Sequence, residues 1–288
     1  MSPFGLRTIL CPVDFSDLSA LALKYAVDFR KCSGGDLLIL FANPFLPPPQ
    51  LTGPQIDQLA EAWNESKRST EQYLASFVEK QLGEAPTGIE LIVVESPPVN
   101  AIVETAGLRT VDLIVMGTHG QGGETRMLLG SVAERVLRES GCPVLTVRLK
   151  KEKTKTPAAI RNILVPINFS VVSRMALVSA GRIAECFGAT VSVLRAIEPF
   201  EEPCNEADEM TRLQAWVPPE IRKKCEIQEF VIKGEGAERI VSFAEEEKID
   251  LIVLGAQHRK FFDSTIVGTT TLRVVRHAPC PVFTLIRK

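Results

Sequence analysis

Glycine, serine and histidine residues gather in one short stretch that suits the binding of a phosphate group. The stretch runs from Met116 to Gly123 and is completed by Gly130-Ser131. It follows the apolar run 111–115 and precedes an amphipathic run from Ser131 to Glu139, so the expected order is buried strand, glycine-rich loop and helix. Glycines let a backbone approach an anion, and a helix N-terminus adds unpaired N–H groups and partial positive charge.

Two polar residues near this stretch also have explanations that need no ligand. Ser131 and Glu134 have the spacing of a capping box, which would satisfy helix N–H groups within the chain. Asp14 ends the first expected strand, and its carboxylate would serve equally well in an Asx-turn that caps the following helix. The residues alone leave both alternatives open beside the phosphate hypothesis.

The sequence offers no evident machinery for catalysis around this loop. His119 has no Asp, Cys or second His close by in sequence, so we expect neither a catalytic base nor a metal ligand at this position. We expect His119 to contact a ligand through its backbone. No Walker motif occurs, and Gly234-Glu235-Gly236 lacks the third glycine of a dinucleotide fingerprint. The turn Ser33 to Asp36 follows a helix, which favours a helix C-cap over a pyrophosphate loop. The pattern therefore indicates a protein that binds a phosphate-containing ligand, and it does not indicate a catalyst.

Composition narrows the class of protein further. The 288 residues are 45% hydrophobic and carry a net charge of −2, which argues for a sizeable core and against a broad nucleic-acid surface. Seven cysteines form an odd set without a C-x-x-C pair. We therefore expect neither a metal nor a disulfide framework, and a reducing cytosol as the location. No apolar run approaches the ~20 residues that span a bilayer, so no membrane contact is expected.

Hydrophobic patterning predicts strands that alternate with helices, as in a parallel sheet covered on both faces. The expected strands of the first half are 8–13, 36–42, 89–94, 112–116 and 144–147. The expected helices begin near Asp17 and cover 56–82, 99–108 and 131–139. Residues 43–54 carry five prolines and read as a loop.

The pattern then repeats. Ile163 to Ser170 resembles Ile9 to Ser16 at an offset of 154 positions, and Cys186 follows Cys32 by the same offset. From Asp250 onward the offset to the first half is 138 positions, so the second copy has a shorter connecting helix between its second and third strands. We predict one domain over 1–148, a polar linker over 149–158 and a second domain over 159–288.

These motifs together resemble the universal stress protein family, and the two copies resemble its tandem members. The resemblance rests on Gly117-x2-Gly120-x9-Gly130-Ser131, on Pro12 to Ser16 at the end of the first strand, and on Ser131 to Leu137 in the last helix. It covers essentially the whole chain. It implies an α/β fold of two tandem open five-stranded parallel sheets in the order 3-2-1-4-5, with helices on both faces. Ligands of such sheets bind at the switch point, here between the first and fourth strands.

The complete glycine motif is typical of family members that bind ATP. By position, the resemblance assigns the base and ribose to Pro12, Asp14, Ala42 and Met116. It assigns the phosphates, with any Mg²⁺ that they hold, to Gly117, His119, Gly120, Gly130, Ser131 and Val132. Arg126 in the loop would add a cationic contact.

The second copy departs from this motif. Asn168 takes the position of Asp14, His258 that of Gly120, and Leu272 that of Glu134. A side chain at Gly120 would cost room for a phosphate and would strain a backbone that needs positive φ. We therefore predict that the second copy binds ATP weakly or not at all and serves to cover the first.

The last strand of each copy, 144–147 and 282–285, would be an exposed apolar edge and an aggregation hazard. In the family such edges pair antiparallel between subunits, so the resemblance implies an intrachain pseudo-dimer, with possible further association of two chains. The favoured interpretation is a cytosolic stress-response protein with one ATP site that regulates its interactions. The alternatives are a nucleotide-independent interaction protein and a slow ATP hydrolase.

Overall fold

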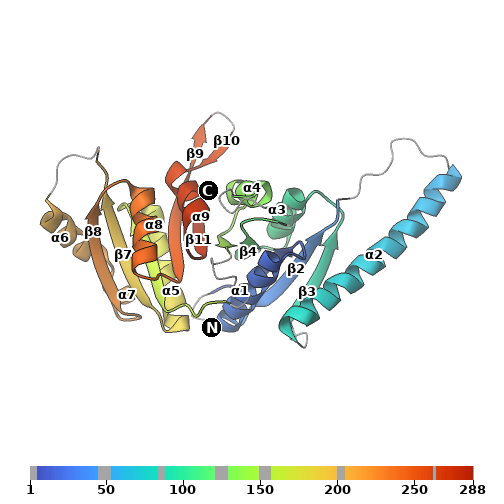
Figure 1. Ribbon diagram of the computed structural model, residues 1–288, viewed down its shortest axis with the longest axis horizontal. Coiled ribbons are helices and arrows are strands. Elements are labelled where there is room, and N and C mark those ends of the chain that lie inside the picture. Colours follow the sequence, from blue (N-terminus) through green and yellow to red (C-terminus); the bar gives the residue numbers. More distant parts are fainter. Residues whose placement is uncertain are drawn as a thin grey trace.

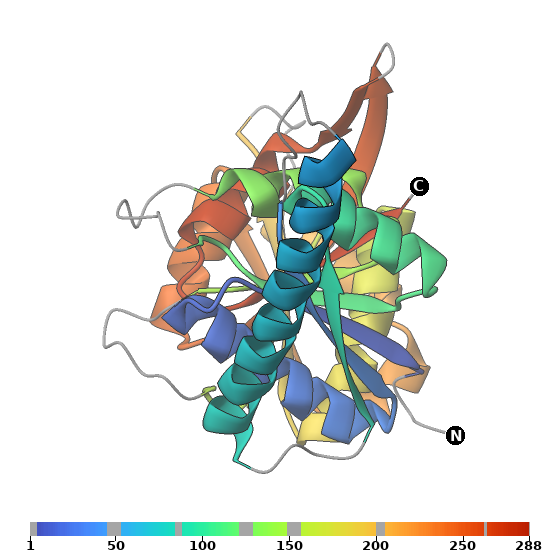
Figure 2. The same ribbon diagram turned by 90° about the vertical axis from the view of Figure 1, so that its right-hand side faces the viewer.

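The structure is a computed structural model that describes residues 5–44, 53–83, 88–120, 129–148, 157–199, 205–261 and 264–287. Two α/β units lie side by side, and the long helix α2 extends from one end (Figures 1 and 2). We call residues up to 148 the first copy and those from 159 onward the second copy. Residues 149–156, most of the predicted linker, lie outside the described part of the chain, so the predicted boundaries stay a prediction.

The elements of the first copy alternate between strand and helix. They are β1 (Thr8–Val13), α1 (Asp17–Ser33), β2 (Asp36–Ala42), α2 (Gly53–Leu82), β3 (Ile89–Val94), α3 (Pro98–Leu108), β4 (Leu113–Gly117), α4 (Ser131–Glu139) and β5 (Val144–Val147). Helix α1 ends at Gly34, which has a φ of 71° and whose N–H donates to the carbonyl of Arg30. The predicted C-cap at this turn is confirmed.

The second copy repeats this order with two changes. Its elements are β6 (Asn162–Ile167), α5 (Val171–Phe187), β7 (Thr190–Ile197), α6 (Glu206–Trp216), α7 (Pro219–Arg222), β8 (Ile227–Lys233), α8 (Gly236–Glu246), β9 (Leu251–Phe261), β10 (Ser264–Val267), α9 (Thr269–His277) and β11 (Val282–Arg287). The 11-residue α6 stands in place of the 30-residue α2, as the change of offset predicted. The hairpin of β9 and β10 was not expected from the sequence.

Both copies have the predicted strand order, and their sheets join into one. The order along the joined sheet is β3-β2-β1-β4-β5-β11-β9-β6-β7-β8, with β10 paired to β9 alone. Along this order neighbours within a copy are parallel, whereas β5 and β11 are antiparallel, as are β9 and β10. In that pair Leu145 lies opposite Phe283, its own counterpart at the offset of 138. Pairing between counterparts is what a twofold axis produces, so the predicted intrachain pseudo-dimer is confirmed.

Each face of the joined sheet carries one continuous apolar core. Alternate residues of a strand point to opposite faces, so Ile9 and Cys11 enter one core and Leu10 enters the other. The first core packs under α1, α2, α5 and α6, and the second packs under α3, α4, α8 and α9. Because each core spans both copies, burial of apolar surface holds the copies together.

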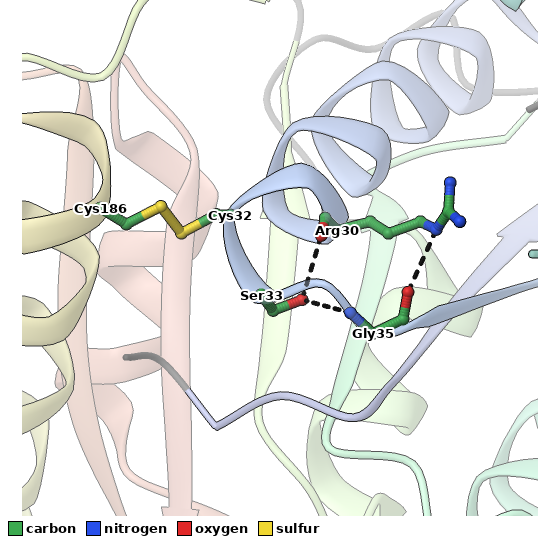
Figure 3. Close-up of a disulfide and its surroundings, with 5 residues drawn as sticks. All are labelled: Arg30, Cys32, Ser33, Gly35 and Cys186. Atoms are coloured by element: carbon green, nitrogen blue, oxygen red, sulfur yellow. Dashed lines mark hydrogen bonds between the residues drawn. A yellow bond between two sulfur atoms is a disulfide. The ribbon is translucent and has the colours of Figure 1, made fainter. Parts of the chain in front are cut away.

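A disulfide between Cys32 and Cys186 also joins the copies, with 5.9 Å between the two Cα atoms. It links the C-terminal end of α1 to α5, and the two cysteines are counterparts at the offset of 154 (Figure 3). The expectation that the cysteines form no disulfide is therefore wrong for this pair. The cause is geometric, because a twofold axis brings a residue near the axis close to its own repeat.

A single carboxylate bridges the copies on the opposite face of the sheet. Glu134 of α4 accepts from Arg138 at 2.6 Å and from Arg276 of α9 at 3.0 Å. Arg138 and Arg276 are counterparts at the offset of 138, whereas the counterpart of Glu134 is Leu272. One negative charge thus separates two equivalent positive charges at the axis.

The disulfide predicts a measurable share of stability. We expect Cys32→Ser to lower the free energy of unfolding of the oxidised protein by about 2–4 kcal/mol, because the unfolded chain loses a long-range constraint. Chemical denaturation with and without a reductant measures this, and reduction should lower the stability of the parent chain equally. Cys225→Ser, which changes a half-buried thiol outside the disulfide, is the matched control. Alkylation of both Cys32 and Cys186 in the unreduced protein would contradict the assignment.

Candidate functional site

A cavity of about 460 Å³ lies at the carboxyl ends of β1 and β4 in the first copy. These two strands are neighbours in the sheet although β2, β3 and three helices separate them in sequence. All ten site residues named from the sequence line this one cavity: Pro12, Asp14, Ala42, Met116, Gly117, His119, Gly120, Gly130, Ser131 and Val132. The volume falls within the range of sites for small molecules and cofactors. Their contact with a nucleotide stays a prediction.

Sequence reasoning missed one wall of the cavity. Leu40 and Phe41 near the end of β2, together with Pro98 and Ile102 from the start of α3, make an apolar side opposite the glycine loop. Val13, Ser19, Thr118 and Ala133 complete the lining. The predicted strand order contained a signal for this wall, since β2 lies next to β1 and its carboxyl end must reach the same edge of the sheet.

Asp14 is held in place by the turn that starts α1. Its Oδ1 accepts from the N–H of Ser16 at 3.1 Å and from the hydroxyl of Ser16 at 2.6 Å. The Asx-turn is therefore confirmed, although the N-cap itself is Ser16, which accepts from the N–H of Ser19. Phe15 takes a φ of 64° within this turn and packs against Phe41 and Phe77. The turn fixes the Asp14 carboxylate at the cavity.

The glycines of the motif are needed for different reasons. A Cβ on Gly120 would lie 2.7 Å from Oδ2 of Asp14, so the loop folds back onto the end of β1. Gly120 is not among the glycines with positive φ, and the strain expected there from φ is wrong: close approach requires the glycine. A Cβ on Gly117 would lie 2.8 Å from Cγ of Leu18, so Gly117 lets α1 pack against the end of β4.

The N-terminus of α4 presents unpaired donors to the cavity. The first helical hydrogen bond runs from the N–H of Glu134 to the carbonyl of Gly130, whereas the Gly130 N–H donates to Thr118 at 2.8 Å. The N–H groups of Ser131, Val132 and Ala133 consequently have no acceptor among the residues that the structure describes. These are the groups that bind anions at helix N-termini.

The capping box, which the spacing of Ser131 and Glu134 left open as an alternative, does not form. Ser131 is the first residue of α4, the N-cap is Gly130, and no side chain caps the helix. Glu134 turns to Arg138 and Arg276 instead, because the pseudo-twofold axis brings a second arginine within its reach. The Ser131 hydroxyl is therefore not committed to a cap. Arg126, the predicted cationic contact, lies outside the described residues.

His119 places a ring nitrogen at the same site. Its Nδ1 is 2.9 Å from the hydroxyl of Thr118, and its buried Nε2 has no hydrogen-bond partner among the described atoms. With the Thr118 hydroxyl as donor, the ring proton lies on Nε2, where it would be available to an acceptor on a ligand. Burial lowers the pKa of His119 from its usual value, and the nearby charge of Arg148 lowers it further. The side chain thus offers a donor at the cavity, and the contact of a ligand with the backbone of His119 stays a prediction.

The equivalent segment of the second copy has a different shape. Gly255 is kept, and a Cβ there would lie 2.6 Å from the carbonyl oxygen of Val172, so this glycine has the packing role of Gly117. Beyond it the chain continues as β9 and returns as β10, with His258 paired to Val267. The second copy thus continues as a strand at the position where the first copy folds back at Gly120, and the hairpin of β9 and β10 rises above the sheet (Figure 1). Strand β10 lies against α4 of the first copy.

Charged side chains also occupy the second copy where the first copy has its cavity wall. Arg195, the counterpart of Phe41, is buried and pairs with Glu209 at 2.9 Å. Glu198, the counterpart of Pro44, accepts from the N–H of Gly236 at 3.0 Å, at the N-terminus of α8. This carboxylate therefore caps α8, the counterpart of α3, whereas the counterpart of α4 is α9.

Within the described residues, no group of three or more His, Cys, Asp and Glu side chains is arranged to hold a metal ion. None of the helices in the same part of the chain is long and apolar enough to cross a membrane.

Comparison with known proteins identifies relatives for both copies. A model of the universal stress protein family matches residues 5–148 and 159–285. Over 147 residues the chain is 35% identical to universal stress protein MJ0531 of Methanocaldococcus jannaschii, which covers 51% of this chain and 85% of that protein. It is also 35% identical to universal stress protein YxiE of Bacillus subtilis over 148 residues, which covers 49% of this chain and 97% of YxiE. A universal stress protein structure from Archaeoglobus fulgidus matches 100% of both chains in fold, with a TM-score of 0.71 at 23% identity.

The lowered pKa of His119 predicts a pH dependence of stability. The unfolded chain takes up a proton near pH 6.5, whereas the folded protein does so only at lower pH. The unfolded state then binds more protons, so the free energy of unfolding should fall as the pH falls below about 6.5. Denaturation of the parent and of His119→Asn between about pH 7.5 and 5.5 measures this, with exposed His277→Asn as the control. An unchanged pH dependence in His119→Asn would contradict the assignment.

Proposed function

The chain belongs to the universal stress protein family, and from this premise we propose that its first copy binds ATP in the cavity at the ends of β1 and β4. The observation that carries the proposal is the convergence of Asp14, Gly120 and the N-terminus of α4 on that cavity. A fixed carboxylate, a loop without side chains and unpaired helix N–H groups are what a nucleotide needs for its ribose or base and for its phosphates.

The cavity suggests an orientation for the nucleotide. The apolar wall of Leu40, Phe41 and Ile102 suits the adenine ring, and Asp14 is placed to accept from its amino group or from a ribose hydroxyl. The phosphates, with the Mg²⁺ that they carry, would meet the N–H groups of Ser131 and Val132 and the Nε2 of His119. Placing the phosphates there satisfies donors that otherwise lack partners.

We propose that the site binds ATP without rapid turnover. Asp14 is already committed to the Asx-turn through Oδ1, and burial keeps His119 neutral at the phosphate end. A base that activates water must reach the attacked phosphorus and be oriented by a further group. Slow hydrolysis remains the second candidate function. Assay of phosphate release over hours by the parent and by Asp14→Ala separates it from binding alone.

ATP would act as a regulatory ligand through α4. This helix meets the phosphates at Ser131, contacts the second copy through Glu134 and Arg276, and lies against β10. A shift of α4 on binding would therefore reach the hairpin of the second copy. We propose a nucleotide-dependent interaction module that works in a stress response in the cytosol, where oxidation would close the Cys32–Cys186 disulfide. Association of two chains is part of this proposal.

The central prediction is that ATP binds to one copy only. Asp14→Ala and Gly120→Val should each weaken ATP binding about tenfold or more, because the first removes a charged acceptor and the second fills the approach of the loop to β1. Asn168→Ala is the matched control, since Asn168 makes the same turn with Ser170 at 3.2 Å in the second copy. Isothermal titration calorimetry with Mg-ATP gives the affinity and the number of sites, and we expect one site per chain.

Three outcomes would contradict this assignment. Equal weakening by Asn168→Ala and Asp14→Ala would show that the copies bind alike. Two sites per chain would show the same. Absence of binding at millimolar ATP in equilibrium dialysis would favour the nucleotide-independent interaction protein instead.

A further inference from the structure

A second cavity, of about 370 Å³, lies between the copies at the end of the sheet opposite the ATP site. Segments that precede strands of the first copy form one side, including Leu6 before β1, Asp112 before β4 and Cys142 before β5. Ser179 and Arg182 of α5 and Phe283 of β11 form the other side. Nothing in the proposed nucleotide site uses these residues.

The pseudo-twofold axis generates an equivalent position elsewhere in the molecule, and Tyr25 fills it. Ser179 follows Tyr25 by 154 positions, so the two residues are counterparts on α5 and α1. The Tyr25 ring is 4% exposed, and its hydroxyl accepts from the N–H of Ala158 at 3.2 Å. Burial raises the pKa of Tyr25 to about 12, with smaller contributions from Cys280, Asp250 and Asp28.

The residues near Tyr25 show that its position corresponds to the cavity beside Ser179. Cys280 and Asp250 are the counterparts of Cys142 and Asp112 at the offset of 138, and both of the latter line the open cavity. Asp28 is the counterpart of Arg182 at the offset of 154. The same frame therefore holds a buried phenol ring on one side of the axis and, among the described residues of the other side, a cavity lined by the small Ser179.

The open side differs from the filled side in charge and in its wall. Arg182 is exposed and makes no hydrogen bond or ion pair in the part of the chain that the structure describes. Phe283, which is 2% exposed, stands where the filled side has Leu145. Asp112, the acidic residue of the lining, is held by the N–H groups of Arg7 and Thr8, which donate to its Oδ2 at 2.7 and 3.0 Å. The cavity thus offers a cation and an aromatic wall.

We propose that this interdomain cavity binds a small aromatic carboxylate. The ring takes the space that Tyr25 fills on the other side of the axis, next to Phe283, and the carboxylate pairs with Arg182. The pair is exposed at the mouth, so most of the affinity comes from burial of the ring. Such a ligand contacts both copies at once, and it therefore stabilises their association.

The test uses 4-hydroxybenzoate as the probe, because its ring and hydroxyl reproduce the Tyr25 side chain. Calorimetry on the full chain should give one site with a Kd of about 1 mM or below, the range of a ligand of this size. Ser179→Tyr should abolish binding, because it restores on α5 the ring that α1 carries. Arg182→Gln should weaken binding of 4-hydroxybenzoate about two- to fivefold and leave binding of phenol unchanged.

Two controls separate binding in this cavity from nonspecific binding to surface arginines and from loss of the fold. Arg161→Gln changes an exposed arginine that lies outside the cavity and should leave binding unchanged. Thermal unfolding of Ser179→Tyr establishes that the variant folds. The proposal is overturned if the parent chain shows no saturable binding of 4-hydroxybenzoate. It is also overturned if a folded Ser179→Tyr variant binds the probe as the parent does.

Discussion

The antiparallel pair of β5 and β11 is the contact on which the arrangement of the molecule depends. Each of these strands would otherwise be an unpaired apolar edge, and their pairing places Leu145 opposite its own counterpart Phe283. A twofold relation between the copies follows from that register. The two continuous cores, the Cys32–Cys186 disulfide and the carboxylate of Glu134 between two equivalent arginines all lie where this relation places them.

Because the two copies share one frame, each difference between them can be related to function. The glycine that lets a helix pack against the fourth strand is kept in both copies, as Gly117 and Gly255. The glycine that lets the loop approach the first strand is kept only as Gly120, and the second copy has a hairpin there. The fold thus requires the first glycine, and the proposed nucleotide site would account for the second. Tyr25 and Ser179 differ in the same manner, because the ring of Tyr25 is buried on one side of the axis and Ser179 lines the proposed ligand cavity on the other.

Much of the fold and of the candidate site could be predicted from the sequence. Repeated strand and glycine motifs carried the resemblance, the resemblance implied the strand order, and that order brings Asp14 and Gly120 to one edge of the sheet. The pairing of Cys32 with Cys186 could not be predicted, because it depends on how the copies face each other. The same holds for Glu134, whose spacing from Ser131 suggested a cap but whose partner Arg276 belongs to the other copy. The hairpin of β9 and β10 has no counterpart among the described residues of the first copy.

The central claim is that a duplicated fold keeps one nucleotide site and has lost the other. The most direct measurement is a crystal structure of the full chain grown with Mg-ATP. The account predicts electron density for one nucleotide per chain, with its phosphates at the N–H groups of Ser131 and Val132 and its base near Asp14. Density in the second copy beside Asn168 and Glu198, or an empty first cavity at saturating ATP, would contradict it.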